Sequence, residues 1–347
     1  LVGIVGIFAA RPLLELMDSP ENVIDGATLY MQIYFIGMPA NMLYTFGASI
    51  LRAVGDTKRP LYYLSVAGII NVVLNLFLVI VCNLSVAGVA IATVISQIVS
   101  MVLVMVCLMR SEGAIHLDLR KVRFHGKCLL EILRVGLPAG LQGSLFSISN
   151  VLIQSAVNSF GSTVMAGNAA ASNLEGFIYA AMNSFYQAAI TFVSTNIGAG
   201  KYSRIRRSAG ACVTLVTLVG IALGTFGYLF MPQLFSIYST DPEVIAAGMR
   251  RFTIYGTTYF ICGIMDTLCG TLRGMGASVL PMVVSLLGAC AFRIMWIYLI
   301  LPLNNTLEML YYSYPASWLL TGCTHLICYF VWLKRYPVDP EAERQLA

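Results

Sequence analysis

Charged residues are scarce in this sequence. Asp, Glu, Lys and Arg make up 11% of its 347 residues, whereas a soluble domain contains about 25%. Hydrophobic residues make up 58%, and the mean hydropathy is +0.80. A protein with so few charged residues cannot cover its surface with groups that face water. The composition therefore predicts an integral membrane protein.

Residue patterns typical of enzymes and metal sites are also scarce. There are three histidines, and the nine cysteines are scattered without metal-ligand spacing. No paired His/Asp motif or nucleophile elbow occurs, so we expect no enzyme activity. The 21 Lys and Arg residues lie in short loops without interleaved aromatic residues. This arrangement argues against nucleic acid as a partner.

Long uncharged runs predict the membrane spans, since one crossing needs about 20 residues. The run over 60–109 is too long for one span, and we expect it to turn at Asn83 to Ser85. The run over 135–174 is expected to break near Gly161. The chain starts at Leu1 inside an apolar run, which we interpret as the end of a cut-off span. We therefore predict nine full spans after a partial first one.

One short stretch occurs twice at a constant offset. LRAVGDTKRPL (51–61) and LRGMGASVLPM (272–282) share leucine, arginine, glycine and proline at the same places. In each copy we expect the glycine to permit a turn, the arginine to stay in water and the proline to lie in the first turn of the next helix. Such a distant repeat indicates two homologous bundles, an organisation typical of transporters whose site lies between them.

Loop charges predict the topology. Alternate loops are rich in Lys and Arg, whereas the five loops between them contain none. The positive-inside rule therefore places the basic loops and the C-terminus in the cytoplasm. Arg250 and Arg251 fit this pattern least well, and we expect them to reach outward or to pair with Glu243. The predicted divisions are an N-lobe remainder (1–109), a cytoplasmic linker (110–128), a C-lobe (129–335) and a cytoplasmic tail (336–347).

Three ionisable residues lie well inside predicted spans: Glu175, Asp266 and Arg293. Each costs about 2.5–3.5 kcal/mol at the centre of a span and therefore needs a partner or a wet cavity. The functional interpretation is that Glu175, together with Asp266, takes up and releases a coupling ion, either H⁺ or Na⁺. The alternative is that Arg293 permanently neutralises one carboxylate and that the three residues only tie helices together.

Polar side chains recur at helical spacing in the same region. The predicted stripes are Asn168, Ser172, Glu175, Tyr179 and Tyr186; Tyr255, Tyr259, Cys262 and Asp266; Ser285, Ala289, Arg293 and Trp296; and Gln142, Asn150, Gln154 and Asn158. These stripes predict one shared polar cavity. The alternative is that the amides join helices without binding a ligand. His325 is predicted to be a packing residue.

Five segments in order resemble the multidrug and toxic compound extrusion (MATE) family. They are LRAVGDTKRP (51–60), AGVAIATVISQ (87–97), VGLPAGLQ (135–142), NIGAGKYSRIRRSAG (196–210) and LRGMGASVLPM (272–282). The segment CAFRIMWIYL (290–299) is similar to a branch common in bacterial members. The resemblance covers nearly the whole chain.

The resemblance implies an all-α integral membrane fold of twelve helices in two inverted-V lobes of six. It also implies a monomeric antiporter in the cell inner membrane that exports amphipathic, often cationic, small molecules, with Na⁺ or H⁺ in place of a cofactor. Some members use an acidic residue in the seventh helix, which the stretch 146–154 lacks. Glu175 and Asp266 then match acidic positions in the eighth and tenth helices. A flippase for lipid-linked oligosaccharides and a non-transporting scaffold remain alternatives.

Overall fold

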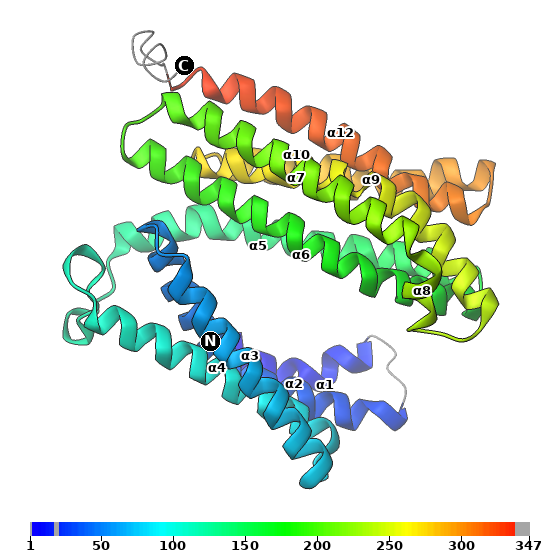
Figure 1. Ribbon diagram of the computed structural model, residues 1–347, viewed down its shortest axis with the longest axis horizontal. Coiled ribbons are helices and arrows are strands. Elements are labelled where there is room, and N and C mark those ends of the chain that lie inside the picture. The colour runs from blue at the N-terminus through cyan, green and yellow to red at the C-terminus, as the bar shows by residue number, and fades with distance from the viewer. Residues whose placement is uncertain (1, 17–20, 337–347) are drawn as a thin grey trace. The chain divides into compact units, whose positions relative to one another are not determined.

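The computed structural model describes residues 2–16 and 21–336, and within these ranges every regular element is a helix (Figure 1). Nearly all of the predicted tail over 336–347 lies outside the described residues. The chain divides into two compact units, Leu1–Arg123 and Phe124–Ala347.

The first unit contains four helices. They are α1 (Val2–Leu16), α2 (Glu21–Ala53), α3 (Lys58–Leu76), which continues as a π-helix over Phe77–Val81, and α4 (Ser85–Arg110). α2 packs between α1 and α4, and α3 packs on α4. The predicted turn between α3 and α4 is confirmed, since Asn83 and Ser85 adopt left-handed φ values of 50° and 44°.

The second unit is built around α9. Its helices are α5 (Gly126–Asn158), α6 (Ser162–Gly198), α7 (Ser203–Leu229), the short α8 (Met231–Ser236), α9 (Pro242–Gly274), α10 (Val279–Ser285), α11 (Phe292–Met295) and α12 (Leu307–Leu333). α10 and α11 form one continuous segment with π-helical stretches over Leu286–Ala291 and Trp296–Ile300. α9 packs against α6, α7 and α12.

The predicted number of helical segments is confirmed within the described residues: nine long ones follow the shorter α1. Five of them are long and apolar enough by composition to cross a membrane. α2, α5, α6 and α9 fall outside that group although they contain 33, 33, 37 and 33 residues. Their length exceeds the roughly 20 residues of one crossing. In α5, α6 and α9 the residues of the predicted polar stripes lower the hydropathy.

The two copies of the repeat adopt the same local structure. Gly55 and Gly276 have φ values of +89° and +80°, which favour glycine. In both copies an N–H beyond the glycine bonds back to the helix, from Asp56 to Leu51 and from Ala277 to Leu272, each at 3.0 Å. This bond defines a Schellman helix end. The predicted glycine turn is therefore confirmed in each unit.

Glycines bring α6 and α9 close together. A Cβ atom on Gly167 would lie 2.7 Å from the backbone N of Gly248, and one on Gly270 would lie 2.7 Å from the carbonyl O of Tyr186. Real Cβ atoms do not approach other atoms so closely. Small residues thus permit backbone contact along this helix pair. As a result, side chains of α6 and α9 can interact directly in the interior of the second unit.

Candidate functional site

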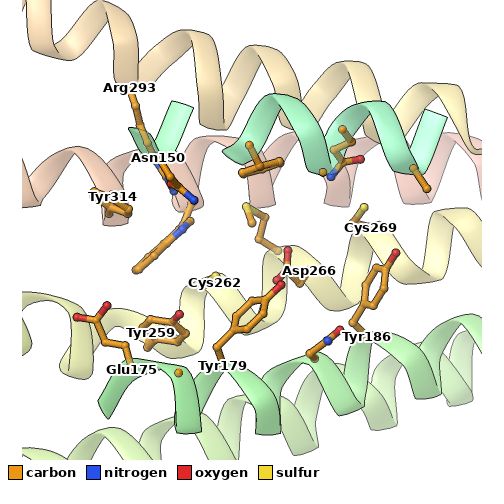
Figure 2. A pocket seen from close by; sticks show the side chains of 18 of the residues that line it. Asn150, Glu175, Tyr179, Tyr186, Tyr259, Cys262, Asp266, Cys269, Arg293 and Tyr314 are labelled. Carbon is orange, nitrogen blue, oxygen red and sulfur yellow. The ribbon is translucent and has the colours of Figure 1, made fainter. Parts of the chain in front are cut away.

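A polar cavity of about 570 Å³ lies within the second unit. Its walls come from α5, α6, α9, α11 and α12, and each of the four predicted stripes contributes at least one lining residue. Figure 2 shows Glu175, Tyr179 and Tyr186 of α6 along one side and Asn150 and Arg293 opposite, with Asp266 of α9 between them.

Glu175 is held in a buried ion pair with Arg251. The Arg251 guanidinium donates through Nε to Oε1 at 2.9 Å and through Nη2 to Oε2 at 2.6 Å. A third guanidinium nitrogen donates to the amide oxygen of Asn168. The two charged side chains are 10% and 7% exposed. This fork-shaped pairing gives each carboxylate oxygen a hydrogen bond. Glu175 therefore lines the cavity as a carboxylate whose charge is balanced by Arg251.

The prediction for Arg251 was therefore wrong. It points inward, whereas the neighbouring Arg250 is exposed and lies 3.8 Å from Glu308. Successive helical residues are about 100° apart, so adjacent arginines face different directions. The alternative in which Arg293 neutralises Glu175 does not describe this structure either, because Arg251 occupies both oxygens of that carboxylate.

Asp266 differs from Glu175. It is partly exposed and lines the cavity, and within the described residues it forms no hydrogen bond or ion pair. It lies eight residues before the end of α9 at Gly274, about 12 Å at the helical rise. Asp266 is thus an interior residue of the helix. Arg273 and Arg293 act on it electrostatically from the same cavity.

Arg293 is fixed by polar and aromatic contacts. Its Nε donates to the Ser317 hydroxyl at 2.7 Å, and its guanidinium carbon lies 4.1 Å from the ring centroid of Tyr314. A cation over an aromatic face is stabilised by the ring quadrupole. Of the stripe predicted with Arg293, neither Ser285 nor Trp296 lines the cavity. Both contact α12 instead: the Ser285 hydroxyl lies 3.4 Å from His325 Nε2, and Trp296 Nε1 donates to the Met309 carbonyl at 2.9 Å.

Arg273 also points into the cavity, so the prediction that both repeat arginines stay in water was wrong for this copy. Its guanidinium donates to the Gln142 side-chain oxygen at 2.7 Å and to the Tyr186 hydroxyl. Gln142 lies on α5 and Tyr186 on α6, so one side chain connects three helices. The polar stripes provide the acceptors that allow this arginine to turn inward.

The other predicted residues divide into two groups. Asn150, Tyr179 and Tyr259 line the cavity beside Glu175, Asp266 and Arg293. Gln154 and Asn168 do not line it but lie behind it. Asn168 donates to Gln154 at 2.9 Å, and Gln154 donates to Asn158 at 2.8 Å. These amides connect α5 with α6, as the packing alternative for the amide stripes describes.

Sequence reasoning missed Arg251, Arg273, Tyr314 and Trp318. A signal for Arg251 was available, since it lies four residues before Tyr255 and continues the stripe that leads to Asp266. The same stripe continues from Asp266 to Arg273, seven residues later. His325 is placed as predicted: it is fully buried and lies 3.3 Å from the Met265 carbonyl and 3.4 Å from that of Pro281.

Comparisons with known proteins agree with this fold. The probable multidrug resistance protein YoeA of Bacillus subtilis is 28% identical over 96% of this chain and 74% of its own length. YpnP of the same organism, also a probable multidrug resistance protein, is 28% identical over 84% of this chain and 65% of its own length.

Solved structures show the same architecture. The Vibrio cholerae MATE transporter VcmN in its bent form superposes with a TM-score of 0.85 at 20% identity, over 96% of this chain and 76% of that one. Residues 1–77 and 138–299 match the MatE family model. The chain therefore belongs to the MatE family, whose members are multi-pass membrane transporters and not enzymes.

Proposed function

We propose that the protein exports amphipathic, often cationic, drugs or metabolites by antiport with Na⁺ or H⁺. The cavity supports this proposal because it combines carboxylates with the aromatic rings of Tyr179, Tyr259, Tyr314 and Trp318. Aromatic faces attract flat organic cations. The two Bacillus relatives, named as probable multidrug resistance proteins, point in the same direction.

The observation that carries the proposal is the difference between the two cavity carboxylates. Glu175 is bound by Arg251, whereas Asp266 has no ion-pair partner among the described residues. A coupling group must bind and release an ion in each cycle. Glu175 can do so only after its guanidinium bonds break. We therefore assign ion exchange to Asp266. The role that we assign to the pair of Glu175 and Arg251 is to position α6 against α9.

Orientation and assembly form part of the proposal. We place the basic loops and the C-terminus on the cytoplasmic side of the cell inner membrane, since the positive-inside rule favours this arrangement. We propose a monomer that needs no cofactor besides the coupling ion. The cavity would open alternately to the two sides of the membrane.

The test uses purified protein in proteoliposomes with a fluorescent cationic dye. Dye movement is followed under an imposed Na⁺ gradient and, separately, under a pH gradient. We expect movement under one of them, which identifies the ion, and loss of that movement in Asp266→Asn. Asp241→Asn is the matched control: Asp241 caps the start of α9 by accepting from the Glu243 N–H at 2.9 Å. Asparagine caps helices equally well, so this control should transport normally.

Two results would contradict the proposal. Normal coupled transport by Asp266→Asn would remove the ion-exchange role from that residue. No dye movement under either gradient, with folded protein, would reject cation antiport. In that case the second candidate is a flippase for lipid-linked oligosaccharides. It is supported by Arg273 and Arg293, which line the cavity and suit a phosphate. A fluorescent lipid-linked sugar in the same vesicles tests it.

A further inference from the structure

A second hollow, of about 720 Å³, lies on the other face of α9. We call it the α7–α12 groove, because these two helices form its sides and α9 forms its floor. Ile264 and Leu268 line the floor. Each is two residues from Asp266, or about 200° around the helix. The groove is thus separate from the polar cavity, and Trp318 borders both.

Small residues keep the groove open. Ala209 and Gly210 of α7 face it from one side, and Gly322 and Cys323 of α12 face it from the other. A Cβ atom on Gly210 would have no neighbour within 4 Å. The hollow is therefore a real space between side chains that larger residues would fill.

The lining is apolar and accessible from outside the second unit. Leu319, Leu326 and Phe330 of α12 are 56%, 41% and 56% exposed. In a membrane-spanning protein, an exposed apolar surface of this kind contacts lipid. From Trp318 to Phe330 the groove follows twelve residues of α12, about 18 Å at the helical rise. That is more than half of the roughly 30 Å hydrocarbon core, a length that suits an acyl chain.

One end of the groove is basic. Arg206, in the second turn of α7, lines it together with Tyr329 of α12. Lys201, Arg204 and Arg207 are exposed in the adjoining loop and first turns. Basic side chains at a membrane surface attract anionic headgroups. We infer that the α7–α12 groove binds an anionic phospholipid, with one acyl chain between α7 and α12 and its phosphate held by Arg206.

Native mass spectrometry of the purified protein tests this inference. The protein is reconstituted in equal amounts of phosphatidylglycerol and phosphatidylcholine with identical chains, and then extracted. We expect one phosphatidylglycerol to be retained in preference to phosphatidylcholine. Removing one charge in Arg206→Gln should weaken retention about fivefold. Gly210→Leu should abolish it, because the new side chain would occupy the groove from a position where its Cβ atom has no neighbour within 4 Å.

Two control variants separate this site from general charge and general folding. Arg204→Gln removes an equivalent charge from the same segment but does not line the groove. Gly68→Leu adds the same side chain to an open position on α3. Both should retain phosphatidylglycerol like the unmodified protein. Equal retention of the two lipids, no retained lipid, or unchanged retention in Gly210→Leu would each overturn the inference. Transport is not measured in this experiment, so its result is independent of the proposed antiport.

Discussion

Replacing Arg251 by glutamine tests the buried ion pair most directly. The substitution removes both hydrogen bonds to Glu175 and the bond to Asn168, in a pair whose side chains are 10% and 7% exposed. Breaking a buried pair by removing one partner costs about 3–5 kcal/mol, because the remaining charge has no counter-charge. We expect the free energy of unfolding to fall by this amount in Arg251→Gln.

The neighbouring arginine provides a matched control. Arg250 is 66% exposed and lies 3.8 Å from Glu308, and an exposed pair of this kind is worth about 0–1 kcal/mol. Arg250→Gln should therefore change stability little. Denaturant titration in mixed micelles measures both variants through tryptophan fluorescence. All three tryptophans, Trp296, Trp318 and Trp332, lie in the second unit, so the signal reports the unit that contains the pair.

A double variant distinguishes the pair from a simple loss of volume. Arg251→Met combined with Glu175→Leu removes both charges, and apolar replacement of a buried pair is often neutral or stabilising. We expect this double variant to recover most of the stability lost in Arg251→Gln. Equal effects of Arg250→Gln and Arg251→Gln would refute the reasoning. So would a double variant no more stable than Arg251→Gln.

Two further predictions concern glycines, each measured by the same titration. Gly276→Ala should destabilise the protein by about 1–2 kcal/mol, because a Cβ atom disfavours the φ of +80° at this position. The control is Gly136→Ala, inside α5, where an added Cβ has nothing within 4 Å. It should instead stabilise the protein by about 0.5–1 kcal/mol. Gly270→Val should lower the free energy of unfolding by disrupting the tight α6–α9 contact, because its Cβ would lie 2.7 Å from the Tyr186 carbonyl oxygen. Gly136→Val, at an open position, is its control. A stable Gly276→Ala would argue against the repeat turn, and a Gly270→Val as stable as Gly136→Val would argue against the close helix contact.

The sequence alone determined the class of protein and the positions of its helices. Charge scarcity and the lengths of uncharged runs are local properties, and in lipid a spanning segment has helices or closed barrels as its only options. The turns at Asn83 and near Gly161 were predictable in the same way, because each divides an uncharged run that is too long for one span. The repeat glycines, Gly55 and Gly276, identified helix ends because the required φ is a property of a single residue.

The tertiary structure alone decided which charges meet. Spacing placed Glu175 and Asp266 on polar faces, but helix spacing contains no information about the partner that faces them. α9 brings Arg251 to Glu175 and leaves Asp266 without an ion pair among the described residues. The inward orientation of Arg273 also depends on packing, because its hydrogen-bond acceptors, Gln142 and Tyr186, belong to two other helices. Pairing energies depend on distances across helices, and only the folded chain sets those distances.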